Sequence, residues 1–89
     1  MIYVAKELKA IENNFDHDID DYINGVDPIG SFDNSYIFTM GALEGIKRLA
    51  ISNDPEHVQE YILMCDTKMA NITNLYHKVR DKKEGGKII

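Results

Sequence analysis

The sequence predicts an all-α protein: a three-helix up-down-up bundle with a long C-terminal helix. Two observations predict this fold. Three apolar stripes have spacings of three and four residues, and the two short segments between them are rich in Gly, Pro and Asp. A chain of 89 residues has room for one hydrophobic core. We therefore expect a single helical domain over residues 1–84, followed by a flexible tail over residues 85–89.

The first predicted helix runs from about Ile2 to Asn24. Its apolar residues recur every three or four positions, as in an amphipathic helix: Val4, Leu8, Ile11, Phe15, Ile19 and Tyr22. Gly25 stands where a C-terminal glycine is expected. Residues 25–34 form the first predicted joint, because Asp27 precedes Pro28 and Gly30 adds a further break. Asp33 or Asn34 is then expected to cap the next helix.

The second predicted helix, from about Ser35 to Ile51, is apolar on nearly every side. Its polar strip is narrow and consists of Glu44, Lys47 and Arg48. A helix of this kind is normally packed between neighbours. Gly41 and Gly45 lie four residues apart on one face, and each costs about 1 kcal/mol relative to Ala in a helix interior. This spacing predicts that another backbone approaches the helix closely.

The third predicted helix runs from Pro55 to about Lys83. Asp54 is a suitable N-cap, and Pro55 suits the first helical position. Since this helix is longer than the second, part of its apolar stripe lacks cover within one chain. Together with the apolar second helix, this favours self-association as a homodimer. The candidate contact residues are Phe38, Gly41, Ala42, Gly45, Leu49, Met64 and Leu75.

Charge and composition exclude several classes of function. The net charge is −5, but residues 1–60 hold twelve acidic and four basic residues, whereas residues 61–89 hold three acidic and six basic ones. Because acidic residues are in the majority, we do not expect direct binding to nucleic acid. One cysteine allows no internal disulfide, and no apolar run reaches the ~20 residues of a membrane span. We expect a soluble, cytoplasmic protein that does not bind membranes.

The acidic stretch "FDHDIDDYINGVD", residues 15–27, resembles a calcium-binding loop in its spacing only. Asp16, Asp18 and Asp20 fill the first, third and fifth positions, but Asp21 replaces the glycine of the sixth position. The apolar stripe of the first helix also continues through the supposed loop. Two alternatives remain: these carboxylates face the basic end of the third helix, or they are exposed to solvent or a partner. The candidate partner-binding residues are Asp16, Asp18, Asp20, Asp21, Asp27 and Asp33.

No pattern in the sequence indicates catalysis or a cofactor. The three histidines, His17, His57 and His77, lie far apart without neighbouring cysteines at metal-ligand spacing. Cys65 lies on an apolar stripe, where a buried, unreactive thiol is expected. We expect no metal, no cofactor and no enzymatic activity. The leading hypothesis is an acidic helical protein–protein interaction module (an adaptor, regulator or inhibitor) that forms a homodimer. The alternative is an acidic nucleic-acid mimic that inhibits a nucleic-acid-binding protein; calcium binding and a small helical enzyme rank third.

Overall fold

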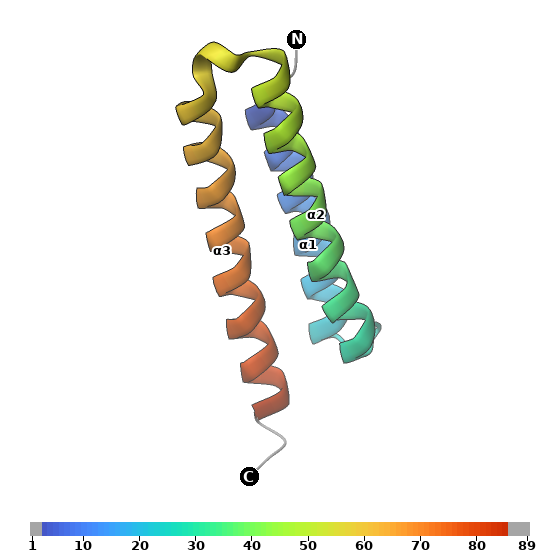
Figure 1. Ribbon diagram of the computed structural model, residues 1–89. Coiled ribbons are helices and arrows are strands. Elements are labelled where there is room, and N and C mark those ends of the chain that lie inside the picture. The colour runs from blue at the N-terminus through green and yellow to red at the C-terminus, as the bar shows by residue number, and fades with distance from the viewer. Residues whose placement is uncertain (1–2, 86–89) are drawn as a thin grey trace.

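The computed structural model describes residues 3–85 and consists there of three helices. They are α1 (Val4–Ile23), α2 (Ile29–Asn53) and α3 (Val58–Gly85), and a 3-10 turn, η1 (Pro55–His57), precedes α3. The helices run down, up and down along an elongated body of 52 × 20 × 16 Å (Figure 1). The predicted all-α, up-down-up bundle is confirmed.

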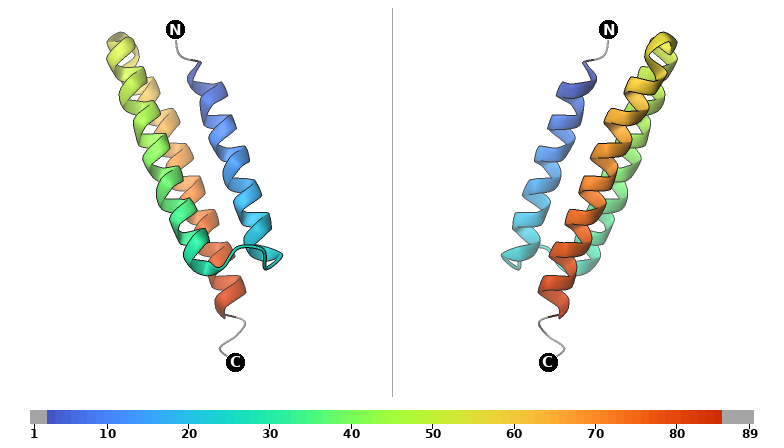
Figure 2. Two further views of the ribbon diagram at one scale, coloured as in Figure 1. Left: turned by 90° about the vertical axis from the view of Figure 1, so that its right-hand side faces the viewer. Right: turned by 90° about the vertical axis from the view of Figure 1, so that its left-hand side faces the viewer.

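The turn between α1 and α2 begins at the predicted glycine. Gly25 has φ of 78°, the left-handed conformation that glycine adopts without strain. Its N–H donates to the carbonyl of Tyr22 at 3.2 Å, and the N–H of Val26 donates to the carbonyl of Asp21 at 2.8 Å. These two bonds form a Schellman motif, which satisfies the last carbonyls of α1. The tight turn is visible at the lower end of the bundle in Figure 2.

The start of α2 differs from the prediction. The helix begins at Ile29, six residues before the predicted Ser35, and Pro28 is its N-cap with an extended ψ of 164°. The N–H of Phe32 donates to the carbonyl of Pro28 at 3.1 Å, which closes the first turn. Asp33 and Asn34 therefore lie inside the helix and do not cap it. With 25 residues α2 is about 37 Å long, so α3 outruns it by less than the sequence predicted.

The second joint lies where it was predicted. Asp54 stands at the N-cap position, but its side chain makes no capping hydrogen bond. Pro55 opens the 3-10 turn, so α3 itself begins at Val58 and not at the predicted Pro55. The Asp54 carboxylate accepts hydrogen bonds from His57 Nδ1 at 2.8 Å and from the hydroxyl of Tyr61 at 2.7 Å. At the other end of α3, Gly85 is still helical, so the helix extends into the predicted tail. The rest of that tail, residues 86–89, lies outside the described residues.

An aromatic cluster fills the core where the end of α1 meets the start of α2. The ring of Phe32 is fully buried and stacks on Tyr22 with centroids 4.3 Å apart and on Phe15 at 5.7 Å. Tyr36 and Tyr76 stack at 4.0 Å and join α2 to α3. The remaining buried hydrophobic residues continue the core along the bundle: Val4, Leu8, Ile19, Leu43, Ala50, Cys65 and Ile72. Stacked aromatic pairs add roughly 0.5–1.5 kcal/mol each beyond their buried area.

Candidate functional site

One side of α2 presents large apolar side chains to solvent. Phe38 is 80% exposed, Ile37 65% and Leu49 50%. Together with Asn34, Gly41, Gly45, Arg48 and Ser52, which lie on the same side of the helix and are also exposed, these residues form what we call the outer face of α2. Within the part of the chain that the structure describes, α1 and α3 cover only the opposite side of α2, so the predicted packing between neighbours is met on one side alone.

The two glycines of the outer face have no neighbours in the structure. A Cβ atom added at Gly41 or at Gly45 would meet no atom within 4 Å. Each glycine destabilises the helix by about 1 kcal/mol relative to alanine. Nothing in the described part of the chain approaches these glycines and compensates for that loss. The close approach predicted from their spacing must therefore come from another molecule, if it occurs.

The predicted self-association residues divide between two surfaces. Phe38, Gly41, Gly45 and Leu49 lie on the outer face of α2, and Ala42 lies half-buried at its edge. Met64 and Leu75 belong instead to the side of the bundle where α3 lies beside α1. Ile37 and Arg48 were absent from the predicted set although they border the same strip. Ile37 stands four residues before Gly41 and Arg48 three residues after Gly45, and this helical spacing could have identified them.

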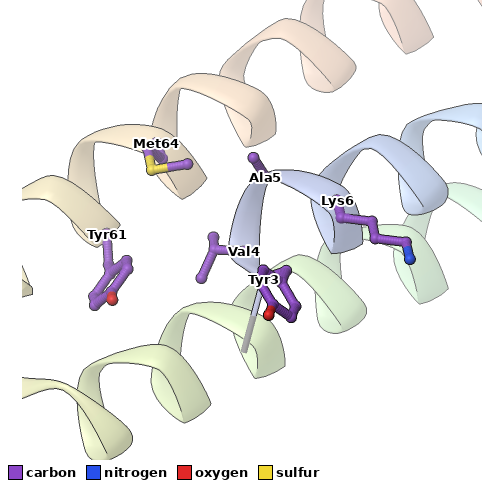
Figure 3. Close-up of a pocket in the computed structure, with 6 residues that line it drawn as sticks. All are labelled: Tyr3, Val4, Ala5, Lys6, Tyr61 and Met64. Atoms are coloured by element: carbon purple, nitrogen blue, oxygen red, sulfur yellow. The ribbon is translucent and has the colours of Figure 1, made fainter. Parts of the chain in front are cut away.

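Shallow apolar hollows lie between α1 and α3. One, of about 440 Å³, is lined by the start of α1 and the first turns of α3. Figure 3 shows Val4 between Tyr61 and the backbone of α1, with Met64 above it. A second hollow of about 430 Å³ lies near the other end of the bundle, where Lys78, Lys82 and Lys83 surround Ile23, Leu75 and Val79.

The six predicted partner-binding aspartates occupy three different environments. Asp16 and Asp20 are exposed on α1, as is Asp21, and none of the three takes part in an ion pair within residues 3–85. Asp18, beside α2, and Asp27, in the turn after α1, are half-buried. Burial raises the pKa of Asp18, a hydrogen bond from Ser35 opposes the rise, and the carboxylates of Asp27 and Asp21 add to it. These aspartates therefore do not form one continuous surface.

Asp33 has a partner inside the bundle. Its Oδ1 accepts a hydrogen bond of 2.5 Å from the hydroxyl of Tyr76 and one of 3.2 Å from Arg80 Nε. Burial of Tyr76 and this bond raise the pKa of Tyr76 to about 12. The carboxylate links α2 to the basic end of α3.

The basic end of α3 also contacts the end of α1. Lys83 Nζ donates to the carbonyl of Tyr22 and lies 4.1 Å from the centroid of the Tyr22 ring. A cation is favourable there, because the helix dipole is negative at its C-terminus. The ends of α1 and α3 thus lie together as predicted, but the carboxylates of Asp16, Asp20 and Asp21 form no ion pair with the basic end within residues 3–85. The contacts there are made by the backbone carbonyl of Tyr22 and by Asp33 of α2.

His57 and Cys65 have structural roles in the bundle. His57 pairs with Asp54, and this hydrogen bond raises the pKa of His57. Cys65 is fully buried, and burial raises the pKa of its thiol. Within residues 3–85 no group of three or more His, Cys, Asp or Glu side chains is arranged to hold a metal ion. The acidic stretch up to Ile23 is continuous helix, so it does not form a calcium-binding loop.

None of the three helices, over the residues described, has the length and apolar character needed to cross a membrane. Comparisons with protein-family models, curated proteins and solved structures found no match to this chain. The class of the protein is therefore defined by its fold alone, a three-helix bundle with an exposed apolar helix face.

Proposed function

We propose that this protein is a non-enzymatic protein–protein interaction module, an adaptor, regulator or inhibitor, that forms a homodimer through the outer face of α2. The observation that carries the proposal is the exposure of Phe38, Ile37 and Leu49 along one strip of a single helix. Grouped apolar side chains of this size on a surface typically mark sites of association. Covering Phe38 alone would remove much of an aromatic side chain from water. Each Å² of apolar surface removed in this way stabilises the complex by roughly 25 cal/mol.

The glycines support the same surface. A helix without side chains at Gly41 and Gly45 lets a second backbone approach closely and make many van der Waals contacts. In a monomer these positions only weaken the helix. Association through the outer face of α2 accounts for both the apolar side chains and the glycines.

Sedimentation equilibrium across micromolar concentrations tests the proposal. We expect the unmodified chain to dimerise and Phe38→Asp to be monomeric, with unchanged helical circular dichroism because Phe38 contributes little to the core. Leu63→Asp is the matched control: Leu63 is 70% exposed on α3, and its replacement leaves association unchanged. A monomer at all concentrations, or equal association of the two variants, would contradict homodimerisation through this face.

The acidic-mimic hypothesis remains a second candidate, favoured by the exposure of Asp16, Asp20 and Asp21. If these carboxylates take the place of phosphates, changing all three to Asn should abolish capture of nucleic-acid-binding proteins by the immobilised chain. The control changes Glu7, Glu56 and Glu60 to Gln, which alters the net charge equally at exposed sites elsewhere. Equal capture by both variants would remove this hypothesis.

A further inference from the structure

The hollow near the end of α1 combines apolar side chains with lysines. It measures about 430 Å³ and is lined by Ile23 of α1 and by residues of α3: Leu75, Lys78, Val79, Lys82 and Lys83. At this end of the bundle α3 continues past the end of α1 (Figure 2). Ile23 is 54% exposed and Leu75 37%. Small-molecule sites typically have volumes of roughly 300–1,000 Å³, so this hollow has the size of a ligand site.

The lysines of this hollow carry positive charge that the described chain does not neutralise. Lys78 and Lys82 are exposed, and neither forms an ion pair within residues 3–85. Lys83 Nζ contacts the carbonyl and the ring of Tyr22, which are uncharged. Another hollow between α1 and α3 differs in this respect, because both of its lysines, Lys9 and Lys68, pair with Glu12.

The acidic residues nearby do not line this hollow. At 100° per residue, Asp81 and Glu84 project about 160° and 140° around the axis of α3 from Val79. Asp16 and Asp20 of α1 are also absent from its lining, and neither pairs with a lysine there. The local charge at the hollow is therefore positive, although the whole chain has a net charge of −5.

We propose that this hollow binds a small anionic amphiphile of the fatty-acid class, with one carboxylate and an unbranched alkyl chain. The alkyl chain packs against Ile23, Leu75 and Val79. The carboxylate pairs with Lys78 and Lys82, which lack a carboxylate partner in the described chain. A purely apolar ligand leaves the lysines unpaired, and an inorganic anion leaves the apolar side chains exposed to water. An amphiphile satisfies both.

Size and charge favour a single small molecule over a larger partner. The lining residues of α3 extend over about 12 Å of helix, whereas a stable protein interface buries roughly 800 Å² on each side. An anionic membrane surface meets the whole molecule, whose net charge of −5 opposes its approach. A single carboxylate meets the local charge of the hollow. The hollow lies away from the outer face of α2, so its ligand is independent of the proposed homodimer.

Titration with dodecanoate below its micelle-forming concentration tests the proposal. Calorimetry should show saturable binding, and the methyl NMR signals of Ile23, Leu75 and Val79 should shift. Decanoate is shorter by two methylenes and should bind more weakly, by up to about fourfold for each methylene that loses its contact. Dodecyltrimethylammonium has the same chain length with the opposite charge. It should bind more weakly by roughly tenfold or more, because attraction to the lysines becomes repulsion.

A pair of double variants tests the role of the lysines. Lys78→Gln with Lys82→Gln should weaken dodecanoate binding by roughly threefold or more, since each exposed ion pair contributes modestly. Lys6→Gln with Lys9→Gln is the matched control, because it changes the net charge equally at exposed positions elsewhere and should leave the affinity unchanged. All four side chains are exposed, so both variants should keep the helical circular dichroism of the unmodified chain.

Several results would overturn the proposal. They are the absence of saturable dodecanoate binding, equal affinity for the cationic amphiphile, and equal weakening in the two double variants. NMR shifts at Val4 and Met64 instead would place the ligand in the hollow at the start of α1. Sedimentation with vesicles of phosphatidylcholine and phosphatidylserine, without binding of free dodecanoate, would assign the lysines to a membrane surface. Phe38→Asp should leave dodecanoate binding unchanged, so failure here and failure of homodimerisation are separate results.

Discussion

At the scale of single residues, two tyrosine–aspartate hydrogen bonds show how burial affects the free energy that a hydrogen bond contributes to stability. Tyr76 is 8% exposed and donates to Asp33 across the α2–α3 interface, whereas the half-buried Tyr61 donates to Asp54 at the joint before α3. The two carboxylates are similarly exposed, so the difference lies in the burial of the two hydroxyls. Water can replace a lost donor more readily at the less buried tyrosine.

Tyr76→Phe should therefore lower the free energy of unfolding by about 1.5–3 kcal/mol, the usual value of a hydrogen bond to a charged group. Tyr61→Phe removes the same hydroxyl at the joint and should cost below about 0.5 kcal/mol. Urea unfolding followed by circular dichroism measures both. Equal losses would mean that the Asp33 bond contributes no more than a surface bond.

His57 provides a pH-dependent contact. Its hydrogen bond to Asp54 raises the pKa of His57 above 6.5 and lowers the pKa of Asp54. The His57 contribution to stability is fully present below the pKa of the unfolded chain. It is lost as pH rises through the higher pKa of the folded chain. Proton NMR titration should show a midpoint above 6.5 for His57, and Asp54→Asn should bring it down. An unchanged midpoint would mean that Asp54 is not the cause.

At the scale of elements, sequence patterns identified the helices better than their ends. The stripes of α1 and α3 and the glycine after α1 were predicted, because local chemistry alone determines them. The start of α2 was missed because Pro28 and Gly30 were interpreted as part of a loop. Proline is well suited to a helix N-terminus, where its missing N–H has no partner to lose. Burial of Phe32 against Tyr22 then stabilises the additional turn. No local pattern reveals that contact.

Local sequence patterns also revealed only part of the candidate site. Phe38, Gly41, Gly45 and Leu49 were identified from their types and spacing. That Met64 and Leu75 lie on a different surface depends on how the helices pack. The division of the aspartates, with Asp33 paired to Arg80, also depends on tertiary contacts, since the two residues are 47 positions apart in sequence.

The contact between Lys83 and the end of α1 makes an element-scale prediction. Lys83→Met keeps the aliphatic stem but removes the charge that lies over the Tyr22 ring and beside its carbonyl. We expect a loss of about 1 kcal/mol in urea unfolding, from the cation–π contact and the helix dipole together. Lys82→Met, at an exposed neighbouring position, should be nearly neutral. A similar loss in both variants would indicate a general effect of net charge.

At the scale of the whole molecule, opposite charges in the two halves of the chain meet across helix pairs. Glu12 of α1 pairs with Lys68 of α3 at 2.6 Å, and Lys47 of α2 pairs with Asp66 of α3 at 2.9 Å. These pairs are at least partly exposed to water and contribute little energy individually. Because they join α3 to both α1 and α2, they favour one alignment of the three helices. Within residues 3–85 the outer face of α2 is not covered by α1 or α3, so the proposed dimerisation would couple stability and association there.

This coupling predicts opposite effects of one double substitution. Changing Gly41 and Gly45 to Ala adds Cβ atoms that meet nothing in the monomer, so the helix should gain about 1–2 kcal/mol. If a second helix packs closely against the outer face of α2, as proposed, the same atoms would clash with it, and we expect association at least tenfold weaker, a loss of about 1.4 kcal/mol. Urea unfolding below the dissociation concentration measures the first effect, and sedimentation equilibrium measures the second.

Gly30→Ala is the matched control, because Gly30 is also exposed on α2 and has nothing within 4 Å of an added Cβ. It lies eleven residues before Gly41, so it should leave association through Gly41 and Gly45 unchanged. In the first turn any gain in helix stability is smaller. At low concentration, where the chains are monomeric, the double variant should be more stable than the unmodified chain. Because dimerisation stabilises the folded state, this advantage should shrink as the concentration rises and the unmodified chain dimerises. A double variant that dimerises as well as the unmodified chain would show that the two glycines do not lie in the interface.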